Sequence, residues 1–199
     1  MRAVVIQQPG TVSICDVAEP EVQPGWALVR PRLVGICGSD LHAYTGHSPL
    51  VAYPVTPGHE FVGEVIALGD ELADPRWPAG RRPPQQILPG ARVVADPSVP
   101  CGRCEPCRTG HYNTCENQRV LGVHLPGAMA DLVLARVDCC LIVPDCLSDE
   151  IAALCEPLSI ALNACDRTAV TRDDRVAILG AGPVGLACLL HCKLRGCRV

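Results

Sequence analysis

The sequence predicts an α/β protein in which a mainly β N-terminal part precedes the start of a parallel α/β domain. Short β-rich segments separated by turns occupy residues 1 to about 144, and no strand–helix alternation interrupts them. Helix signals begin near Ser148. A glycine-rich turn at 180–185 then stands between an apolar strand-like segment and an apolar helix-like segment. These features place a domain boundary near residue 155.

The strands expected in the N-terminal part follow one another closely. Pro9-Gly10 and Pro24-Gly25 separate the first ones as turns. In chain order, the β-rich segments are 2–6, 11–17, 26–34, 61–68, 91–95, 129–135 and 141–143. This succession predicts an antiparallel, barrel-like arrangement. The segment 74–89 is rich in proline and arginine, so we expect a surface loop there.

Helices are expected after residue 147. Ser148 is a suitable N-cap, and Asp149 and Glu150 suit the first turn of a helix. Pro157 can open a second helix that runs to about residue 166. A buried strand is then predicted at 175–179, a helix at 184–195 and the start of another strand at 198–199.

The composition excludes several classes of protein. Of the 199 residues, 48% are hydrophobic and 19% are charged, which is typical of a globular protein. A net charge of −4 and an aromatic content of 3% argue against a nucleic-acid partner, and so against a zinc-ribbon module. The longest apolar run, 176–192, is interrupted by glycines and a proline, which favours a strand, a turn and a helix over a membrane span. The N-terminus lacks a signal peptide, so we expect a cytoplasmic protein.

Four closely spaced cysteines lie in the stretch CGRCEPCRTGHYNTC. They are Cys101, Cys104, Cys107 and Cys115. Tetrahedral zinc binds four thiolates on such a turning loop, and a set of four leaves no open position for a substrate. The sequence therefore predicts a structural zinc lobe at about 96–120, in which Gly102 and Gly110 allow tight turns. Disulfides or small core residues are the competing interpretation. The cysteines in other apolar runs are expected to be reduced core residues: Cys139, Cys140, Cys165, Cys188 and Cys192.

A second metal site is indicated by three residue types in two separate segments. Cys37 lies in GICGSDLH, after one apolar strand, and His59 and Glu60 lie in PGHEFVGEV, before another. Thiolate, imidazole and carboxylate form a catalytic zinc set when one position stays open. A core thiol, a hydrogen-bonded histidine and a surface acid are the alternative. We also expect Gly35, Gly38 and Gly58 to let the backbone approach a metal closely.

A third acid, Glu156, lies within the apolar stretch AALCEPLSIALNA. A metal would satisfy a carboxylate in such surroundings. A solvent-facing carboxylate in the first turn of a helix is the alternative, which Pro157 makes reasonable. The neighbouring Cys155 is a rival ligand, and adjacent side chains point apart, so at most one of the two should reach a metal.

The residues 180–185 fit the pattern G-x-G-x-x-G of dinucleotide-binding turns. They are Gly180, Ala181, Gly182, Pro183, Val184 and Gly185. The first glycine makes the turn, the second admits the pyrophosphate and the third lets helix and strand pack closely. A plain strand–helix turn is the competing interpretation. The acid that would hold the ribose is expected about 20 residues further on, so NAD and NADP are not distinguished.

These four motifs together resemble those of the zinc-dependent medium-chain dehydrogenases, the alcohol and polyol dehydrogenase family. The resemblance covers the whole chain and rests on their shared order. Gly58-His59-Glu60-x-x-Gly63, followed by Gly69, is similar to the zinc signature of the family, although Leu72 is bulkier than its usual last residue. The sequence Glu-Pro-Leu-Ser at 156–159 resembles the sorbitol and sugar-acid branch, as does VLGVHLPGAMADLV, which is also similar to gulonate and galactonate 5-dehydrogenases.

The resemblance implies a GroES-like β-barrel catalytic domain at 1–155 and the start of a Rossmann domain at 156–199. It implies two zinc ions per chain, with Cys37, His59 and Glu156 binding the catalytic one and Glu60 acting as an exchange ligand or supporting the set. Ser39 and His42 resemble the proton relay; a turn serine and a helix-surface histidine are the alternatives.

The activity implied is oxidation of a secondary alcohol of a polyol or sugar acid by NAD or NADP. Full-length family members are commonly homo-oligomers, and the resemblance does not extend this assembly to the shorter chain. Family members carry further βα units beyond the point that corresponds to Val199, so we expect this chain to be truncated. A non-catalytic zinc-binding remnant is the alternative function.

Overall fold

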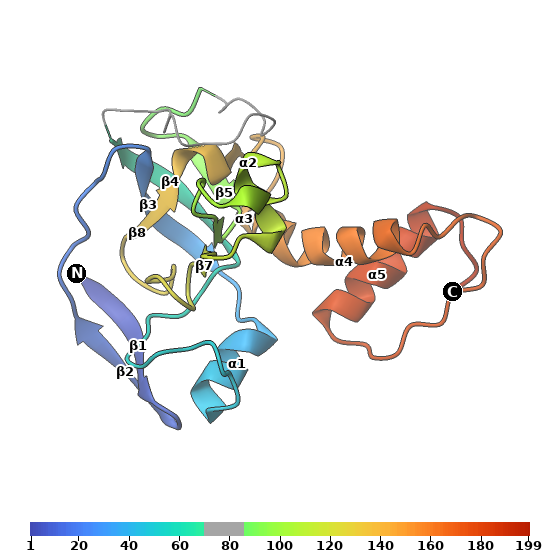
Figure 1. Ribbon diagram of the computed structural model, residues 1–199, viewed down its shortest axis with the longest axis horizontal. Helices are drawn as coiled ribbons and strands as arrows, with labels where there is room; N and C mark the ends of the chain where they lie inside the picture. Colours follow the sequence, from blue (N-terminus) through green and yellow to red (C-terminus); the bar gives the residue numbers. More distant parts are fainter. Residues whose placement is uncertain (70–85) are drawn as a thin grey trace. The chain divides into compact units, whose positions relative to one another are not determined.

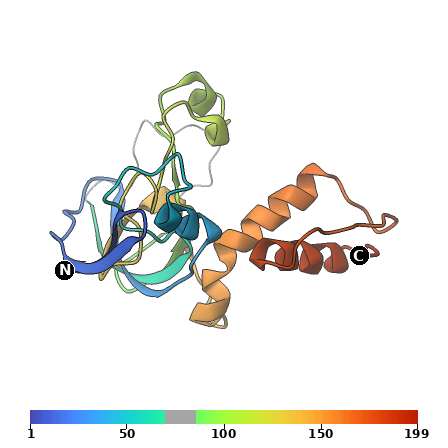
Figure 2. The same ribbon diagram turned by 90° about the horizontal axis from the view of Figure 1, so that it is seen from below.

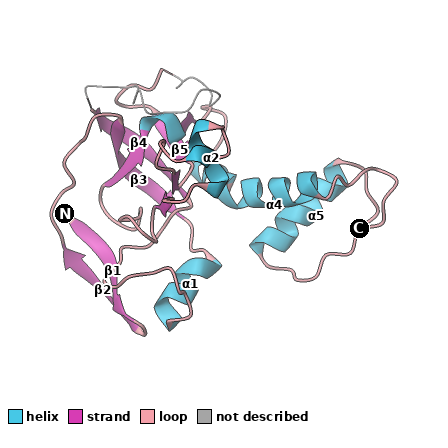
Figure 3. Cartoon of the chain, viewed as in Figure 1, coloured by secondary structure: helices cyan, strands magenta, loops and turns pink. Residues whose placement is uncertain are grey.

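The protein forms two compact units in a computed structural model that describes residues 1–69 and 86–199. The units are Met1–Ala153 and Leu154–Val199. The named strands belong to the first unit, and the two longest helices make up most of the second (Figures 1 and 3). Within the predicted surface loop 74–89, residues 74–85 lie outside the described residues, as does Leu72. Ile87 is only 2% exposed and packs in the main core, so that part of the loop prediction is wrong.

A five-stranded antiparallel sheet forms the centre of the N-terminal unit, as the sequence predicted. Its strands lie in the order β8-β3-β4-β5-β9. Their bounds are β3 (Trp26–Val34), β4 (Phe61–Leu68), β5 (Arg92–Ala95), β8 (Val133–Arg136) and β9 (Cys140–Ile142). A hairpin of β1 (Arg2–Gln8) and β2 (Thr11–Asp16) lies beside it and reaches Ala130 and Val55 through isolated bridges.

Both faces of strand β4 are buried, which fixes its place in the middle of the sheet. Phe61 and Val65 pack in the main core with residues of β3, β5 and β8. Val62 points into a second cluster, which α3 (Asp149–Ala153) covers through Ala152 and Ala153. The backbone N–H of Ile151 donates a 3.4 Å hydrogen bond to Ser148 Oγ, so Ser148 caps this helix as predicted.

The C-terminal unit contains α4 (Cys155–Arg167) and α5 (Pro183–Leu194), which lie side by side (Figure 1). The predicted buried strand at 175–179 is wrong in extent and burial. Arg175 forms only an isolated parallel bridge with Arg198, and Leu179 is fully exposed. A parallel strand is buried when other strands flank it and helices cover both faces. Among the described residues, the segment 175–179 has a single bridge as its pairing, so it is not buried in this way.

Four short helices were not predicted because they span too few residues to show periodicity. They are α1 (Gly38–Thr45), α2 (Glu105–Arg108), η1 (Tyr112–Thr114) and η2 (Val137–Cys139). Among the described residues, every helix falls short of the length and apolar character needed to cross a membrane.

Candidate metal centres and cofactor turn

The pairing of β3 with β4 brings two distant segments together. In this antiparallel pair Val34 lies opposite Phe61, so the end of β3 and the start of β4 meet at the same edge of the sheet. The Gly35 N–H donates a 2.6 Å hydrogen bond to the Glu60 carbonyl and extends the contact beyond the strands. One ligand atom from each of Cys37, His59 and Glu60 therefore lies within 4.8 Å of the others.

Small residues leave room for this set. A Cβ atom on Gly35 would lie 2.5 Å from Glu60 Oε2, and one on Gly58 would lie 2.9 Å from the backbone nitrogen of Met129. Gly58 also has a φ of +98°, which L side chains rarely adopt. A Cβ on Gly38 would meet nothing within 4 Å, so the expectation for this glycine stays a prediction.

The Cys37 thiol lies in a partly buried position. Burial is the main cause that raises its pKa, and the Glu60 carboxylate adds to the rise. Hydrogen bonds from the hydroxyl and the backbone N–H of Ser39 act in the opposite direction. Ser39 therefore faces Cys37, although its side chain is largely exposed. His42 is exposed one turn further along α1.

Asp40 is a site residue that the sequence analysis missed. Its carboxylate accepts hydrogen bonds from the Cys37 N–H at 2.8 Å and from the Gly58 N–H at 3.3 Å. The first bond belongs to a capping box at the start of α1. Asp40 is 7% exposed, and its two bonds join the segments that carry the ligand atoms. The capping pattern of Cys37 with an acid three residues later was the available signal.

The residues fit a metal ion, because they combine soft and hard donors around an unsatisfied ring nitrogen. His59 is 8% exposed, and its Nδ1 has no hydrogen-bond partner among the described residues. Asp40 Oδ1 lies 3.9 Å from that nitrogen, too far for a direct hydrogen bond. A buried imidazole next to a thiol and a carboxylate is the donor set of an open zinc site.

Glu156 lies in the first turn of α4, in the C-terminal unit. The Ser159 hydroxyl donates a 2.7 Å hydrogen bond to the Glu156 carbonyl oxygen. The assignment of Glu156, or of Cys155, as a metal ligand stays a prediction.

The four cysteines of the predicted lobe come together in the N-terminal unit. One sulfur from each of Cys101, Cys104, Cys107 and Cys115 lies within 4.8 Å of the others. Paired strands β6 (Ser98–Val99) and β7 (Arg119–Val120) close the base of the segment, which projects from the rest of this unit (Figure 2). Gly102 and Gly110 have φ values of +70° and +84°, so the expected tight turns are present.

Backbone N–H groups lower the pKa of lobe thiols, whereas burial raises it. N–H groups of Arg103 and Cys104 lower the pKa of Cys101 to about 6. Burial raises the pKa of Cys107 to about 12, and its side chain is fully buried. The N–H groups of Cys101 and Asn117 also donate to Cys115 Sγ, at 3.2 and 3.4 Å. Four converging thiols with N–H donors fit a closed zinc site.

The glycine turn also fits a dinucleotide. Gly180 has a φ of +108°, and a Cβ on Gly185 would lie 2.1 Å from the Gly180 carbonyl oxygen. The third glycine is therefore required for close packing of the turn against α5. Gly182 is the N-cap of α5, with Pro183 as the first helical residue. A Cβ on Gly182 would meet nothing within 4 Å, so the N-terminus of α5 is open for an anion.

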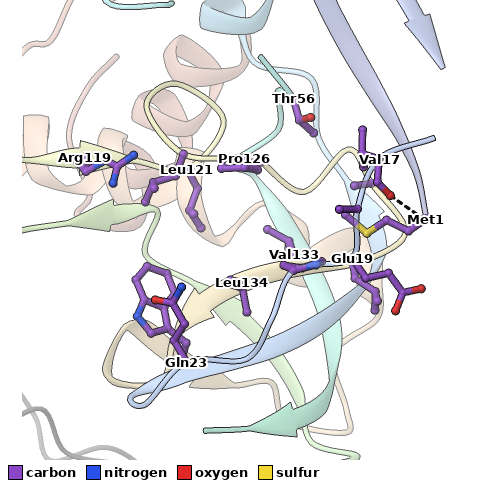
Figure 4. A pocket seen from close by; sticks show the side chains of 17 residues that line it. Met1, Val17, Glu19, Gln23, Thr56, Arg119, Leu121, Pro126, Val133 and Leu134 are labelled. Carbon is purple, nitrogen blue, oxygen red and sulfur yellow. Dashed lines mark hydrogen bonds between the residues drawn. The ribbon is translucent and has the colours of Figure 1, made fainter. Parts of the chain in front are cut away.

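A separate apolar cavity of about 510 Å³ lies elsewhere in the N-terminal unit (Figure 4). Val17, Leu121 and Val133 contribute to its wall, and the Met1 amino group donates a 2.9 Å hydrogen bond to the Val17 carbonyl beside it. The described residues that line this cavity include none of the candidate metal ligands.

Comparison with known proteins identifies the family. The model of the alcohol dehydrogenase GroES-like domain matches residues 23–145. The chain is 36% identical over 200 residues to sorbitol dehydrogenase of Bacillus subtilis, covering 98% of this chain and 53% of the relative. It is 33% identical over 199 residues to L-galactonate-5-dehydrogenase of Escherichia coli, covering 100% of this chain and 55% of the relative.

A solved structure shows the same fold. It is a zinc-binding dehydrogenase of Sinorhizobium meliloti bound to NADP, with a TM-score of 0.86, 36% identity and coverage of 98% of this chain and 54% of that one. The chain thus spans about half the length of these proteins. On this match and on the convergence of its two ligand sets, the chain belongs to the zinc-dependent alcohol dehydrogenase family with a GroES-like domain.

Proposed function

We propose that the protein works as a zinc-dependent oxidoreductase that oxidises a secondary alcohol of a polyol or sugar acid, with NAD⁺ or NADP⁺ as hydride acceptor. The convergence of Cys37, His59 and Glu60 within 4.8 Å carries this proposal. The relatives named sorbitol and L-galactonate-5-dehydrogenase support the substrate class, and the relative bound to NADP supports the cofactor class.

In this proposal two metal positions have different tasks. Cys37, His59 and Glu156 hold the catalytic zinc, and Glu60 either exchanges with a ligand or supports the set. A zinc ion there supplies a Lewis acid that lowers the pKa of the substrate hydroxyl. The lobe of Cys101, Cys104, Cys107 and Cys115 holds the second zinc, which stabilises the fold without contacting substrate.

The chain's own residues would then move the proton outward. Ser39 hydrogen-bonds to Cys37 and is exposed, so it can accept a proton near the metal set and release it toward solvent. His42 follows three residues later on the same helix, which places both side chains on neighbouring turns. We assign the proton relay to this pair.

The cofactor is proposed to bind at the turn Gly180–Gly185, through Gly180, Gly182, Pro183, Val184 and Gly185. The open backbone at Gly182 and the N-terminus of α5 receive the pyrophosphate. When bound, the dinucleotide supplies the redox chemistry. Cytoplasmic location also remains a proposal.

The test combines metal content with turnover. We expect two zinc ions per chain by mass spectrometry, and one in Cys37→Ser. Reduction of NAD⁺ or NADP⁺ with a panel of polyols and sugar acids should be lost in Cys37→Ser and kept in Cys146→Ser, whose residue is exposed in the N-terminal unit. One zinc and no turnover would favour the non-catalytic zinc-binding protein instead.

A further inference from the structure

Four cysteines of the C-terminal unit gather between its helices, and none of them belongs to either metal set. Cys165 lies on α4, Cys188 and Cys192 lie one turn apart on α5, and Cys197 follows α5. Cys165, Cys192 and Cys197 are 6%, 1% and 4% exposed, and Cys188 is partly buried. The function proposed above uses none of them.

Two of these sulfurs are already in contact across the helix pair. Cys165 Sγ and Cys192 Sγ lie 3.8 Å apart and belong to different helices. The thiol of Cys197 donates a 3.0 Å hydrogen bond to the Thr171 carbonyl, and it also lies close enough to Cys192 to act on the pKa of that thiol. Cys188 likewise lies close to Cys165, and Cys165 with Cys192 is the pair whose sulfurs are in contact at 3.8 Å.

A bond between two sulfurs fits this cluster better than a metal ion. Among the described residues, only the two sets already discussed bring three or more ligand atoms within 4.8 Å of one another. The cluster does not meet that condition, whereas its central pair needs only to close from van der Waals contact to the length of a disulfide bond, about 2.05 Å.

We propose that Cys165 and Cys192 form a reversible disulfide that links α4 to α5 when a disulfide oxidant such as oxidised glutathione is present. The Cys165 thiol loses its proton and attacks one glutathione sulfur, which releases the first glutathione as a thiol. Cys192 then attacks the cysteine sulfur of the mixed disulfide and releases the second. Two electrons pass from the cysteine pair to the glutathione disulfide, and both cysteine protons end on glutathione thiols.

The link acts on the segment that contains the glycine turn. The chain between the two cysteines includes residues 180–185 and the first part of α5. Closing this loop restricts its motion in partly unfolded states, so the turn and the start of α5 should open less often. Burial raises the pKa of both thiols, so the bond forms slowly at neutral pH.

The experiment incubates the zinc-loaded chain with excess oxidised glutathione and maps disulfides by tandem mass spectrometry of a non-reducing digest. We expect a Cys165–Cys192 link that dithiothreitol removes. The link should persist in Cys188→Ser and Cys197→Ser and disappear in Cys165→Ser and Cys192→Ser. The exposed Cys146 serves as an internal control, since its glutathionylation shows that the oxidant acted.

A second measurement uses only the wild-type chain, so it does not require any variant to fold. Oxidation of the wild-type chain should slow amide hydrogen exchange in residues 166–191, and reduction should restore the original rates. If Cys146 is fully glutathionylated while Cys165 and Cys192 remain free thiols, the proposal is overturned. A link from either residue to Cys188 or Cys197, or unchanged exchange in a linked sample, overturns it as well.

Discussion

The Asp40 carboxylate lies 3.9 Å from His59 Nδ1, a buried ring nitrogen without a hydrogen-bond partner among the described residues. The same carboxylate accepts hydrogen bonds from the backbone of Cys37 and of Gly58. Asp40 thus holds two segments in register and places a negative charge next to the imidazole. Such a residue positions metal ligands without binding the metal itself.

Replacing Asp40 with Asn should weaken metal binding at the Cys37 set by about 10- to 100-fold, because the charge beside His59 is lost and the amide nitrogen cannot accept one of the two backbone hydrogen bonds. Competition with a zinc chelator measures the change. Asp145→Asn, at an exposed position, is the matched control and should bind as the wild type does. Equal affinity in Asp40→Asn would show that neither the charge nor the second accepted hydrogen bond of Asp40 acts on the set.

Replacing Cys104 with Ser should remove one zinc and unfold the lobe, since Cys104 is buried among the four sulfurs. Loss of a structural metal belongs to the largest single-site effects, so we expect a cost of about 4 kcal/mol or more in the stability of the lobe. Hydrogen exchange in residues 98–120 measures it. Cys146→Ser should leave exchange there unchanged, and a protected lobe in Cys104→Ser would contradict the zinc assignment.

A chelator should remove zinc in two phases. The Cys37 set is predicted to keep an open coordination position, whereas four thiolates close the lobe, so the first zinc should leave faster. Zinc release followed with a coloured chelator gives the two rates. In Cys37→Ser only the slow phase should remain, and a lost slow phase would reverse the assignment of the two sites.

The two glycines Gly182 and Gly185 should respond differently to alanine. A Cβ on Gly185 collides with the Gly180 carbonyl at 2.1 Å, which should destabilise the C-terminal unit by about 1–3 kcal/mol. Gly182 has a φ of −75° and open space around it, so Gly182→Ala should fold normally and weaken only dinucleotide binding. Hydrogen exchange in α5 and titration with NADH and NADPH separate the effects. Equal stability of the two variants would be inconsistent with the packing described.

Arg92 should matter more for stability than another paired arginine, Arg2. The Arg92 guanidinium donates to Asp149 at 3.0 Å and to the carbonyls of Pro144 and Leu147, and these bonds connect β5 to the start of α3. Arg92→Met should cost about 2–4 kcal/mol, because three acceptors lose a charged donor. Arg2 forms an exposed pair with Asp131, so Arg2→Met should change the unfolding curve little. Similar denaturation midpoints for both variants would disprove this ranking.

The sequence by itself determined the elements whose signals are local. The β-rich segments 26–34 and 61–68 predicted β3 and β4 with their observed bounds, and Ser148 predicted the start of α3 because a cap acts within one helical turn. The spacing of four cysteines within fifteen residues sufficed to predict the lobe, since four thiolates on one turning loop can reach the same zinc ion.

Only the tertiary structure decided what depends on pairing between distant segments. The register of Val34 with Phe61 brings Cys37 to His59, and helix packing brings Cys165 to Cys192. Asp40 gained its role because two loops meet around it, and the strand expected at 175–179 lacked flanking strands to bury it. Strand register and burial depend on several segments together, so a local sequence pattern does not predict them.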